Sequence, residues 1–263
     1  MLAIDVRNVS YRYPDGTEAL CDVSLAAQAN RRLAILGANG CGKTTLLMLL
    51  NGLLSAQSGS VRIFGEMVTK KNLRAIRRQV GVLFDNPDNQ LFSTTVFDDV
   101  AFGPYNMGWS DVDVRERSEG ALESLGIRHL AEKPPHNLSL GQKKKAAIAG
   151  LLSMNLRLFV MDEPFSGLDP ISVAEFLETL DDLHQKDCTQ IISTHDVDLA
   201  YSWADEIVII DCGRITAVGN HEILHDEQLL RASRLCLPTL VRIFADTPHR
   251  PRTLQEAQRL IKR

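Results

Sequence analysis

Gly37-Ala38-Asn39-Gly40-Cys41-Gly42-Lys43-Thr44-Thr45 is the stretch of this 263-residue chain that best predicts its fold. It follows a short apolar run, residues 33–36, that is typical of a buried strand. It precedes a second apolar run, residues 46–50, that we predict to be a helix. This order of strand, loop and helix is the setting that the phosphate-loop pattern G-x-x-x-x-G-K-[ST] requires.

Each residue type in this loop has a physical reason to be there. Glycines let the backbone fold into a nest of N–H groups close to a polyphosphate, and the helix N-terminus adds partial positive charge. Lys43 is placed to reach the β- and γ-phosphates, and the Thr44 hydroxyl is placed to bind Mg2+. The alternative is a glycine-rich turn with an incidental lysine, which arises by chance in on the order of one chain in a hundred of this length. The loop residues expected to contact a nucleotide are Gly37, Asn39, Gly40, Cys41, Gly42, Lys43, Thr44 and Thr45.

Composition narrows the possible partners. The net charge is −4 and the sequence pI is about 6.0, so no strongly basic face is expected and nucleic acid is not predicted as a partner. Five scattered cysteines without a C-x-x-C pair fit a reducing cytosol. We expect no signal peptide and no membrane span, since the longest apolar stretch is interrupted at Asn51 and is far short of ~20 residues. At a membrane, such a protein must dock to something embedded in it.

The remaining elements predict an α/β fold with a largely parallel sheet, because strands and helices alternate. Residues 2–13 alternate apolar and polar side chains as an edge strand does. Further strands are predicted at residues 60–64, 80–84, 157–161 and 189–193, and a late hairpin at residues 207–210 and 214–218. Helices are predicted at residues 110–125, which begin with a capping box at Ser110, at about 138–154, and from 170 to about 185.

Two predicted strands end in side chains that can carry chemistry. Asp162 and Glu163 follow one apolar strand, at the edge where α/β sheets place their ligands. Buried acids without partners are costly, which favours a metal or catalytic role. His195 follows the next strand. A lone histidine is usually structural, but its place beside this edge favours a functional one.

Three further features each have two interpretations, and for the third we reject one of them. Tyr13 lies upstream of the loop, where it could stack on an adenine ring or simply pack in its strand. The apolar group within Leu91–Phe102 could be plain core or a groove for a partner helix. His221-Glu222-Ile223-Leu224-His225 matches the zinc-hydrolase pattern H-E-x-x-H, but no third ligand follows at a suitable spacing, so we reject that function.

Taken together, the motifs resemble those of ATP-binding cassette (ABC) transporter ATPases, and the resemblance covers about residues 1–220. It implies an α/β P-loop NTPase (RecA-like) core with a largely parallel sheet, antiparallel N-terminal strands and a helical subdomain. The ATPase domain would span residues 1–220, with the helical subdomain inserted at about 88–155. Residues 221–263 would form a C-terminal helical extension, which we expect to be dispensable for nucleotide binding.

The resemblance also implies roles for particular residues. Tyr13 would stack on adenine, Asp162 and Thr44 would hold Mg2+, Glu163 would polarise the attacking water, and His195 would contact the γ-phosphate of ATP. Residues 138–142 resemble the family's signature motif, with Leu140 where glycine is commonest. The signature residues of one subunit would complete the ATP site of a second ABC ATPase, in a homo- or heterodimer, through Ser139, Gly141 and Gln142.

The motifs Leu-Ser-Leu-Gly-Gln-Lys-Lys-Lys, Asn-Pro-Asp-Asn-Gln-Leu-Phe and Thr-His-Asp-Val-Asp-Leu look like those of energy-coupling-factor ATPases, most of all cobalt/nickel importers. This implies a peripheral protein on the cytoplasmic face of the cell membrane, bound near Leu91–Phe102 to transmembrane subunits that carry the metal. The alternatives are a vitamin or other substrate, or a soluble cassette for DNA repair or translation. A P-loop GTPase is disfavoured because no Asn-Lys-x-Asp appears.

One position departs from the family pattern. The Q-loop glutamine should follow Gly-x-x-Phe, and here that position is Asp85. Its carboxylate could bind Mg2+ more directly, but it would also repel phosphate. Gln90 looks like the glutamine of the Gln-Leu-Phe motif rather than a shifted replacement. We therefore expect Asp85 to be a working substitute near the metal.

Overall fold

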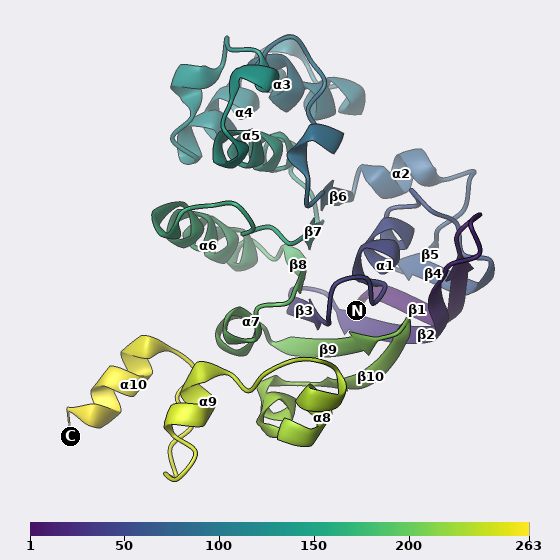
Figure 1. Ribbon diagram of the computed structural model, residues 1–263. Helices are drawn as coiled ribbons and strands as arrows, with labels where there is room; N and C mark the ends of the chain where they lie inside the picture. Colours follow the sequence, from purple (N-terminus) through teal and green to yellow (C-terminus); the bar gives the residue numbers. More distant parts are fainter. Residues whose placement is uncertain (263) are drawn as a thin grey trace.

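The computed structural model describes residues 1–262 and contains two β-sheets with helices packed between and around them (Figure 1). The first sheet is antiparallel, with the order β2-β1-β4-β5. Its strands are β1 (Leu2–Arg12), β2 (Glu18–Gln28), β4 (Ser58–Ile63) and β5 (Glu66–Met67). Strand β1 pairs with both β2 and β4, so the prediction of an edge strand at residues 2–13 was wrong.

Strand β2 was missed by the sequence analysis, and a local irregularity explains why. Asn8 in β1 and Asp22 in β2 both have positive φ, and the pairing register shifts between Val6 and Val9. The Asn8 amide donates to the Asp22 carboxylate at 3.0 Å. Such a bulge interrupts the period-two alternation from which strands are predicted.

The second sheet has the order β10-β9-β3-β8-β7-β6, with five parallel strands and β10 antiparallel at its edge. Its strands are β3 (Arg32–Leu36), β6 (Val80–Leu83), β7 (Leu158–Asp162), β8 (Thr189–Thr194), β9 (Glu206–Asp211) and β10 (Arg214–Gly219). The continuous apolar runs of the parallel strands are buried because helices cover both faces. The predicted parallel sheet and late hairpin are confirmed.

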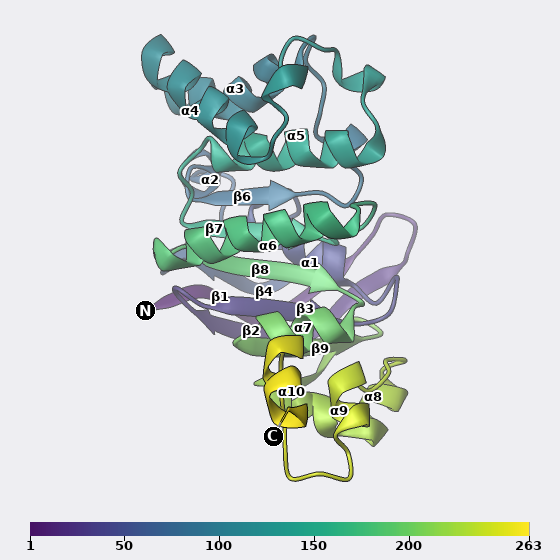
Figure 2. The ribbon, with the colours of Figure 1, turned by 90° about the vertical axis from the view of Figure 1, so that its left-hand side faces the viewer.

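The helices divide between the two faces of this sheet. Helix α1 (Lys43–Leu50) lies between the two sheets, and α6 (Pro170–Gln185) and α7 (Val197–Trp203) lie on the opposite face (Figures 1 and 2). The other helices are α2 (Leu73–Arg77), α3 (Val96–Met107), α4 (Asp111–Ser124), α5 (Leu140–Leu152), α8 (Glu227–Ala232), α9 (Thr239–Ile243) and α10 (Leu254–Ile261). Short 3-10 turns occur at Pro87–Asn89, Arg128–Leu130, Pro135–Asn137 and His221–His225.

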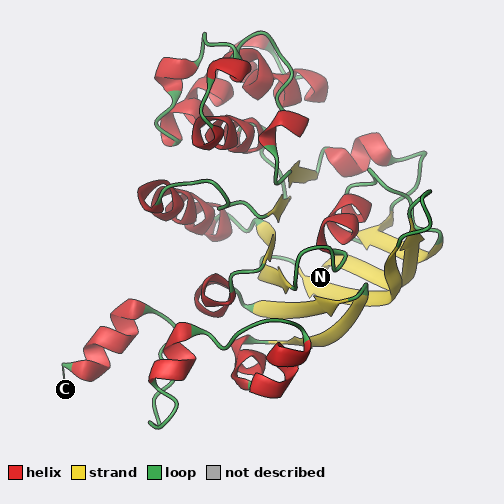
Figure 3. Cartoon of the chain, viewed as in Figure 1, coloured by secondary structure: helices red, strands yellow, loops and turns green. Residues whose placement is uncertain are grey.

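Helices α3, α4 and α5 pack against one another at one end of the molecule, where Figure 3 shows helices joined by loops. Ser110 caps α4 by accepting from the Asp113 N–H, and Ser139 and Gln142 form a capping box on α5. The helical insertion at about 88–155 and the domain boundary at residue 220 stay predictions.

The C-terminal segment is packed onto the core. Leu224 and Leu230 are fully buried. The Arg252 guanidinium donates to the main-chain carbonyls of Tyr201 and Ala204, at 3.0 and 2.7 Å. Across residues 1–262, the helices are all too short or too polar to cross a bilayer.

Candidate functional site

The phosphate loop lies between the end of β3 and the start of α1, as predicted. Gly37 and Gly42 are required by crowding: a Cβ on Gly37 would come 2.3 Å from the Ile210 carbonyl oxygen, and one on Gly42 would come 2.5 Å from that of Ala19. Gly42 also has φ +110, which favours glycine. Lys43 is buried, and its ammonium donates to the carbonyls of Gly37 and Ala38 at 2.7 and 3.2 Å.

Asp162 ends β7 and is held from two neighbouring elements. The Thr44 hydroxyl, in the first turn of α1, donates to its Oδ2 at 2.5 Å. The Ser193 hydroxyl donates to its Oδ1, because the parallel register of β7 and β8 places Ser193 beside it. Asp162 is buried, yet within residues 1–262 its side-chain hydrogen bonds come from two neutral hydroxyls. A buried carboxylate of this kind fits a bound cation.

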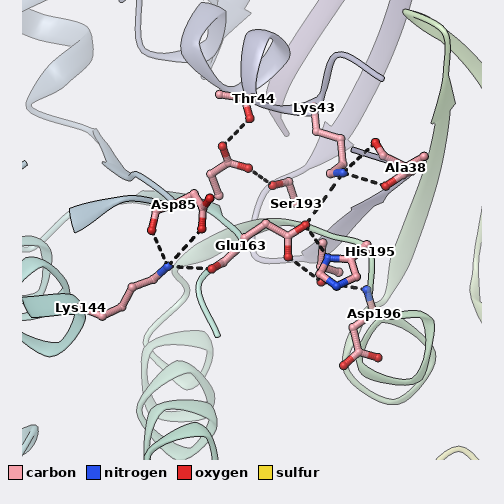
Figure 4. Close-up of polar contacts among 12 residues, drawn as sticks. Ala38, Lys43, Thr44, Asp85, Lys144, Glu163, Ser193, His195 and Asp196 are labelled. Carbon is pink, nitrogen blue, oxygen red and sulfur yellow. Dashed lines mark hydrogen bonds and ion pairs between the residues drawn. The ribbon is translucent and has the colours of Figure 1, made fainter. Parts of the chain in front are cut away.

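Glu163 and His195 meet beside the phosphate loop (Figure 4). The Nδ1 of His195 lies 3.0 Å from Oε1 of Glu163, and the Lys43 ammonium lies 3.9 Å from the same oxygen. The Thr194 hydroxyl donates to Oε2 at 3.4 Å. Glu163 has φ +42, a conformation that non-glycine residues rarely adopt and that is concentrated at functional sites.

A cavity of about 490 Å³ brings most of the predicted site residues together. Its lining comes from four parts of the chain: Tyr13, Asn39, Gly40, Gly42, Lys43, Thr44, Thr45, Asp85, Asp162 and Glu163 are among its residues. The Tyr13 hydroxyl lies 3.0 Å from that of Thr45, so this ring stands at the rim of the loop. Cys41 is buried, and burial raises the pKa of its thiol. Within residues 1–262, the lining omits Gly37, Cys41 and His195.

The signature residues lie elsewhere. Ser139, Gly141 and Gln142 stand at the N-terminus of α5, where the Gln142 side chain accepts from the Ser139 N–H at 3.0 Å. Within residues 1–262 they are absent from the lining of the cavity. Leu140 is exposed and packs on Gly167, where a Cβ would come 2.8 Å from it.

Asp85 lies in the lining of the cavity, and its nearest cation is a residue that the sequence analysis did not single out. Lys144 is 1% exposed, and its ammonium lies 3.7 Å from the Asp85 carboxylate. It also donates to the main-chain carbonyls of Asp85 and Glu163, at 2.9 and 2.8 Å (Figure 4). Burial lowers the pKa of Lys144, and the three nearby carboxylates oppose that shift.

The apolar group within Leu91–Phe102 is partly core and partly surface. Val96 and Val100 are fully buried, whereas Phe92 and Phe102 are 67% and 48% exposed and stack edge to face at 4.8 Å. These two rings help to line a groove of about 690 Å³ together with Arg74, Arg77, Arg78, Gln90, Asp99 and Met107. The Gln90 amide bridges the Phe84 N–H and the Ala147 carbonyl of α5, at 3.4 and 3.3 Å. It thus braces the end of β6, and within residues 1–262 it is absent from the lining of the 490 Å³ cavity.

The H-E-x-x-H segment forms a 3-10 helix, His221–His225, rather than an α-helix. The two histidines pack against one tyrosine, and within residues 1–262 they belong to no group of three or more side chains that could hold a metal ion. The Tyr201 ring centroid lies 5.7 Å from that of His221 and 5.7 Å from that of His225. The rejection of a zinc hydrolase thus agrees with an aromatic packing role for this segment.

Comparison with known proteins adds three findings. The family model described as ABC transporter matches residues 20–166. The energy-coupling factor transporter ATP-binding protein EcfA of Carboxydothermus hydrogenoformans is 44% identical over 265 residues, covering 100% of this chain and 98% of that protein. Its counterpart in Methanosphaera stadtmanae is 47% identical over 244 residues, covering 92% and 88%.

The fold also matches solved structures. The cbiO1 protein of Clostridium perfringens, described as part of the ABC transporter complex cbiONQ, is 37% identical with a TM-score of 0.75, covering 93% of this chain and 99% of that one. An ATP-binding cassette solved as a dimer in a post-hydrolysis state, bound to ADP and Pi, is 25% identical with a TM-score of 0.77, covering 83% and 98%.

Proposed function

Since this chain belongs to the ABC transporter ATPases and, among them, to the energy-coupling-factor EcfA family, we propose that the transport it powers is the import of cobalt or nickel ions. The chain is the ATP-hydrolysing subunit of such a transporter and works with membrane subunits. The cargo proposal is supported by the three importer-like motifs and by the likeness to cbiO1. EcfA proteins serve many substrates, so a vitamin or other cargo is the second candidate.

The observation that carries the catalytic part of the proposal is the meeting of the phosphate loop, Asp162 and Glu163 in one cavity. Lys43 would bind the β- and γ-phosphates of ATP, in exchange for its present bonds to loop carbonyls. Glu163 would accept a proton from the attacking water, and His195, held against it at 3.0 Å, would orient the γ-phosphate.

The donor set around Asp162 fits Mg2+. Thr44 and Asp162 supply the oxygen ligands that this ion prefers. When bound, Mg2+ would neutralise the charge that develops on the phosphates. The sequence predicted Asp85 as a ligand of Mg2+, but its carboxylate faces Lys144. We propose that it serves beside the metal rather than as a main ligand.

A second ABC ATPase subunit would complete each site. Ser139 and Gly141 stand at a helix N-terminus, which favours phosphate, yet within residues 1–262 they are absent from the lining of the chain's own cavity. Relatives of this fold form dimers, one of them with ADP and Pi bound. We propose the same head-to-tail pairing here, with either an identical or a homologous partner.

The membrane subunits would dock in the groove beside Phe92 and Phe102. Exposed aromatic side chains that line a groove are the residue type that anchors interfaces. Phe92→Asp or Phe102→Asp should abolish co-purification with the membrane subunits while ATP binding persists. Val112→Asp changes an even more exposed apolar residue on α4 and serves as the control. Complexes that survive both phenylalanine changes would place the interface elsewhere.

Lys43→Ala tests the nucleotide site directly. The variant should bind ATP more weakly than the wild type by calorimetry, because the phosphates lose their one loop ammonium. Equal affinity would contradict the phosphate role of the loop.

The cargo is tested with the intact complex. We expect proteoliposomes that contain the chain and its co-purified membrane subunits to take up labelled cobalt or nickel when ATP is supplied to the side that carries the ATPase. The same vesicles with Glu163→Gln are the control for hydrolysis. Uptake of a vitamin without metal uptake would establish the second candidate instead.

A further inference from the structure

Lys144 is a buried lysine at a junction between three elements. Its side chain is 1% exposed, and its ammonium reaches two main-chain carbonyls and one carboxylate. Burying a charge is costly unless hydrogen bonds and an opposite charge compensate it. The three contacts of Lys144 supply this compensation, so the position of its ammonium is well defined.

The neighbouring lysines show that this arrangement is specific to one position. Lys143 pairs with Asp88 at 2.6 Å, and Lys145 pairs with Glu175 at 3.1 Å, and both partners are more than half exposed. These two are surface ion pairs of the kind that contributes little. Within the part of the chain that the structure describes, Lys144 is the only one of the three lysines that donates to the main-chain carbonyl of Glu163, the proposed general base.

The two carbonyls belong to the residues that follow adjacent parallel strands. Asp85 lies just beyond β6, Glu163 follows β7, and the strands are paired in register. Lys144 projects from α5, whose first turn also carries Ser139 and Gly141. One ammonium group therefore joins the signature helix to both strand ends.

The contact with Glu163 is made where the backbone is strained. Glu163 has φ +42, a conformation that persists only when its surroundings hold it. Its N–H donates to the Ser193 carbonyl at 3.0 Å, and its own carbonyl accepts from the Ser166 N–H at 3.2 Å and from Lys144 at 2.8 Å. The shortest of these three bonds comes from the lysine.

We infer that Lys144 is a positioning residue for ATP hydrolysis, which holds the Glu163 main chain, and through it the carboxylate, in line with the nucleotide cavity. The inference rests on the proposed role of Glu163 as general base. Because Lys144 moves with α5, it also makes the placement of the acid depend on the position of the signature helix. Misplacing a catalytic group by about 1 Å can cost ~10²-fold in rate.

The test is steady-state ATPase kinetics on the complex of the chain with its membrane subunits. Lys144→Met removes the ammonium and keeps a side chain of similar length. We expect kcat to fall by about 10- to 100-fold while the KM for ATP changes less than about threefold. Lys145→Met, which breaks the neighbouring surface pair, should leave kcat within about twofold of the wild type.

Two further variants separate positioning from a merely structural role. Lys144→Arg keeps the charge and donors and should recover part of kcat. In a Glu163→Gln background, Lys144→Met should cause little further loss, since the group that it positions is already gone. A full additional loss in that background would mean that Lys144 acts on something other than Glu163, and would overturn the inference.

Separate controls distinguish a misfolded variant from a failure of the role proposed for Glu163. If Lys144→Met does not fold, Lys144→Gln, which keeps a donor, is judged by the same ratio of kcat to KM effects. A folded Lys144 variant with wild-type kcat, alongside an inactive Glu163→Gln, would refute the positioning role alone. If Glu163→Gln itself retains wild-type turnover, the proposed general base and this inference both fail.

Discussion

The hydroxyl oxygen of Thr44 lies 2.5 Å from Oδ2 of Asp162, which joins the first turn of α1 to the end of β7. Ser193 donates to the other carboxylate oxygen, so the acid is fixed from both sides by neutral groups. Mg2+ takes oxygen ligands of this type and favours a fixed geometry. The arrangement thus places a pre-oriented carboxylate beside the phosphate loop.

Asp162→Asn should raise the Mg2+ concentration required for half-maximal ATPase activity. The amide keeps the shape of the carboxylate but loses its charge, and even indirect partners of a metal contribute about 10- to 100-fold to affinity. Rates measured over a Mg2+ titration check this. Ser193→Ala, which removes one supporting hydroxyl, should have a smaller effect, and an unchanged Mg2+ dependence in Asp162→Asn would exclude it as a ligand.

Glu163→Gln should lower ATP turnover by roughly 10²–10⁴-fold while ATP binding survives. The amide cannot accept the proton of the attacking water, although it can keep the contact with His195. Turnover and ATP affinity are measured on the same preparation. Glu175→Gln removes an exposed carboxylate and serves as the control. Unchanged turnover would remove Glu163 from the mechanism.

Asp85→Gln should change the ATPase rate by less than about tenfold, or ~1.4 kcal/mol. The Asp85 carboxylate lies 3.7 Å from the Lys144 ammonium, and this pairing offsets the repulsion that a free negative charge would exert on phosphate. The rate is followed against Mg2+, with and without membrane subunits. If Asp85→Ala equals the wild type in ATPase rate, in Mg2+ dependence and in stimulation by the membrane subunits, Asp85 has no role in hydrolysis.

A chain that ends at Gly219 should still bind ATP but unfold at a lower temperature. Removal of the tail uncovers Tyr201 and deletes the bonds that Arg252 makes to α7 and its C-cap. We expect the Tm to fall by at least about 5 °C, since 1 kcal/mol corresponds to ~2–4 °C in a chain of this size. A folded truncation without ATP affinity would place part of the site in the tail.

Stability should decline when the pH falls below about 6.5, partly through His221 and His225. Burial lowers the pKa of both from the ordinary 6.5, with Arg252 adding to the shift of His221, Arg250 to that of His225, and Glu222 opposing both. The unfolded chain therefore takes up protons first, and the folded state loses stability as the pH drops through this window.

Urea unfolding at pH 7.5 and 5.5 measures this effect. Replacing both histidines with glutamine should reduce the loss of unfolding free energy between the two pH values. His129→Gln alters an exposed histidine and is the control. An equal pH dependence in the double variant would assign the effect to other groups.

The phosphate loop and the acids after β7 could be predicted because their signals are local. A glycine pattern between a strand and a helix, and charged residues that follow an apolar run, are visible within ten residues or so. The pairing of β1 was mispredicted because strand order depends on contacts distant in sequence. The bulge at Asn8 and Asp22 also disguised β2.

Lys144 could not be predicted for a related reason. It is the middle of three consecutive lysines, and nothing in the sequence says which one faces inward. Its burial follows from the adjacency of β6 and β7 and from the rotation of α5 above them. The same holds for Phe92 and Val96, two apolar residues of one short stretch. Phe92 lies on the surface and Val96 in the core, and the sequence does not distinguish them.

Helix α7 joins two regions that are far apart in the sequence. It begins after Asp196, next to His195, and the Asp198 carboxylate accepts from the N–H and hydroxyl of Thr239, at 2.6 and 2.8 Å. Asp198, which contacts the tail, thus lies only three positions after the histidine. If ATP also binds more tightly in one position of α7, any molecule whose affinity for the tail differs between these positions alters ATP affinity, and ATP alters the affinity of that molecule by the same factor. In that case the tail both regulates the ATP site and responds to it.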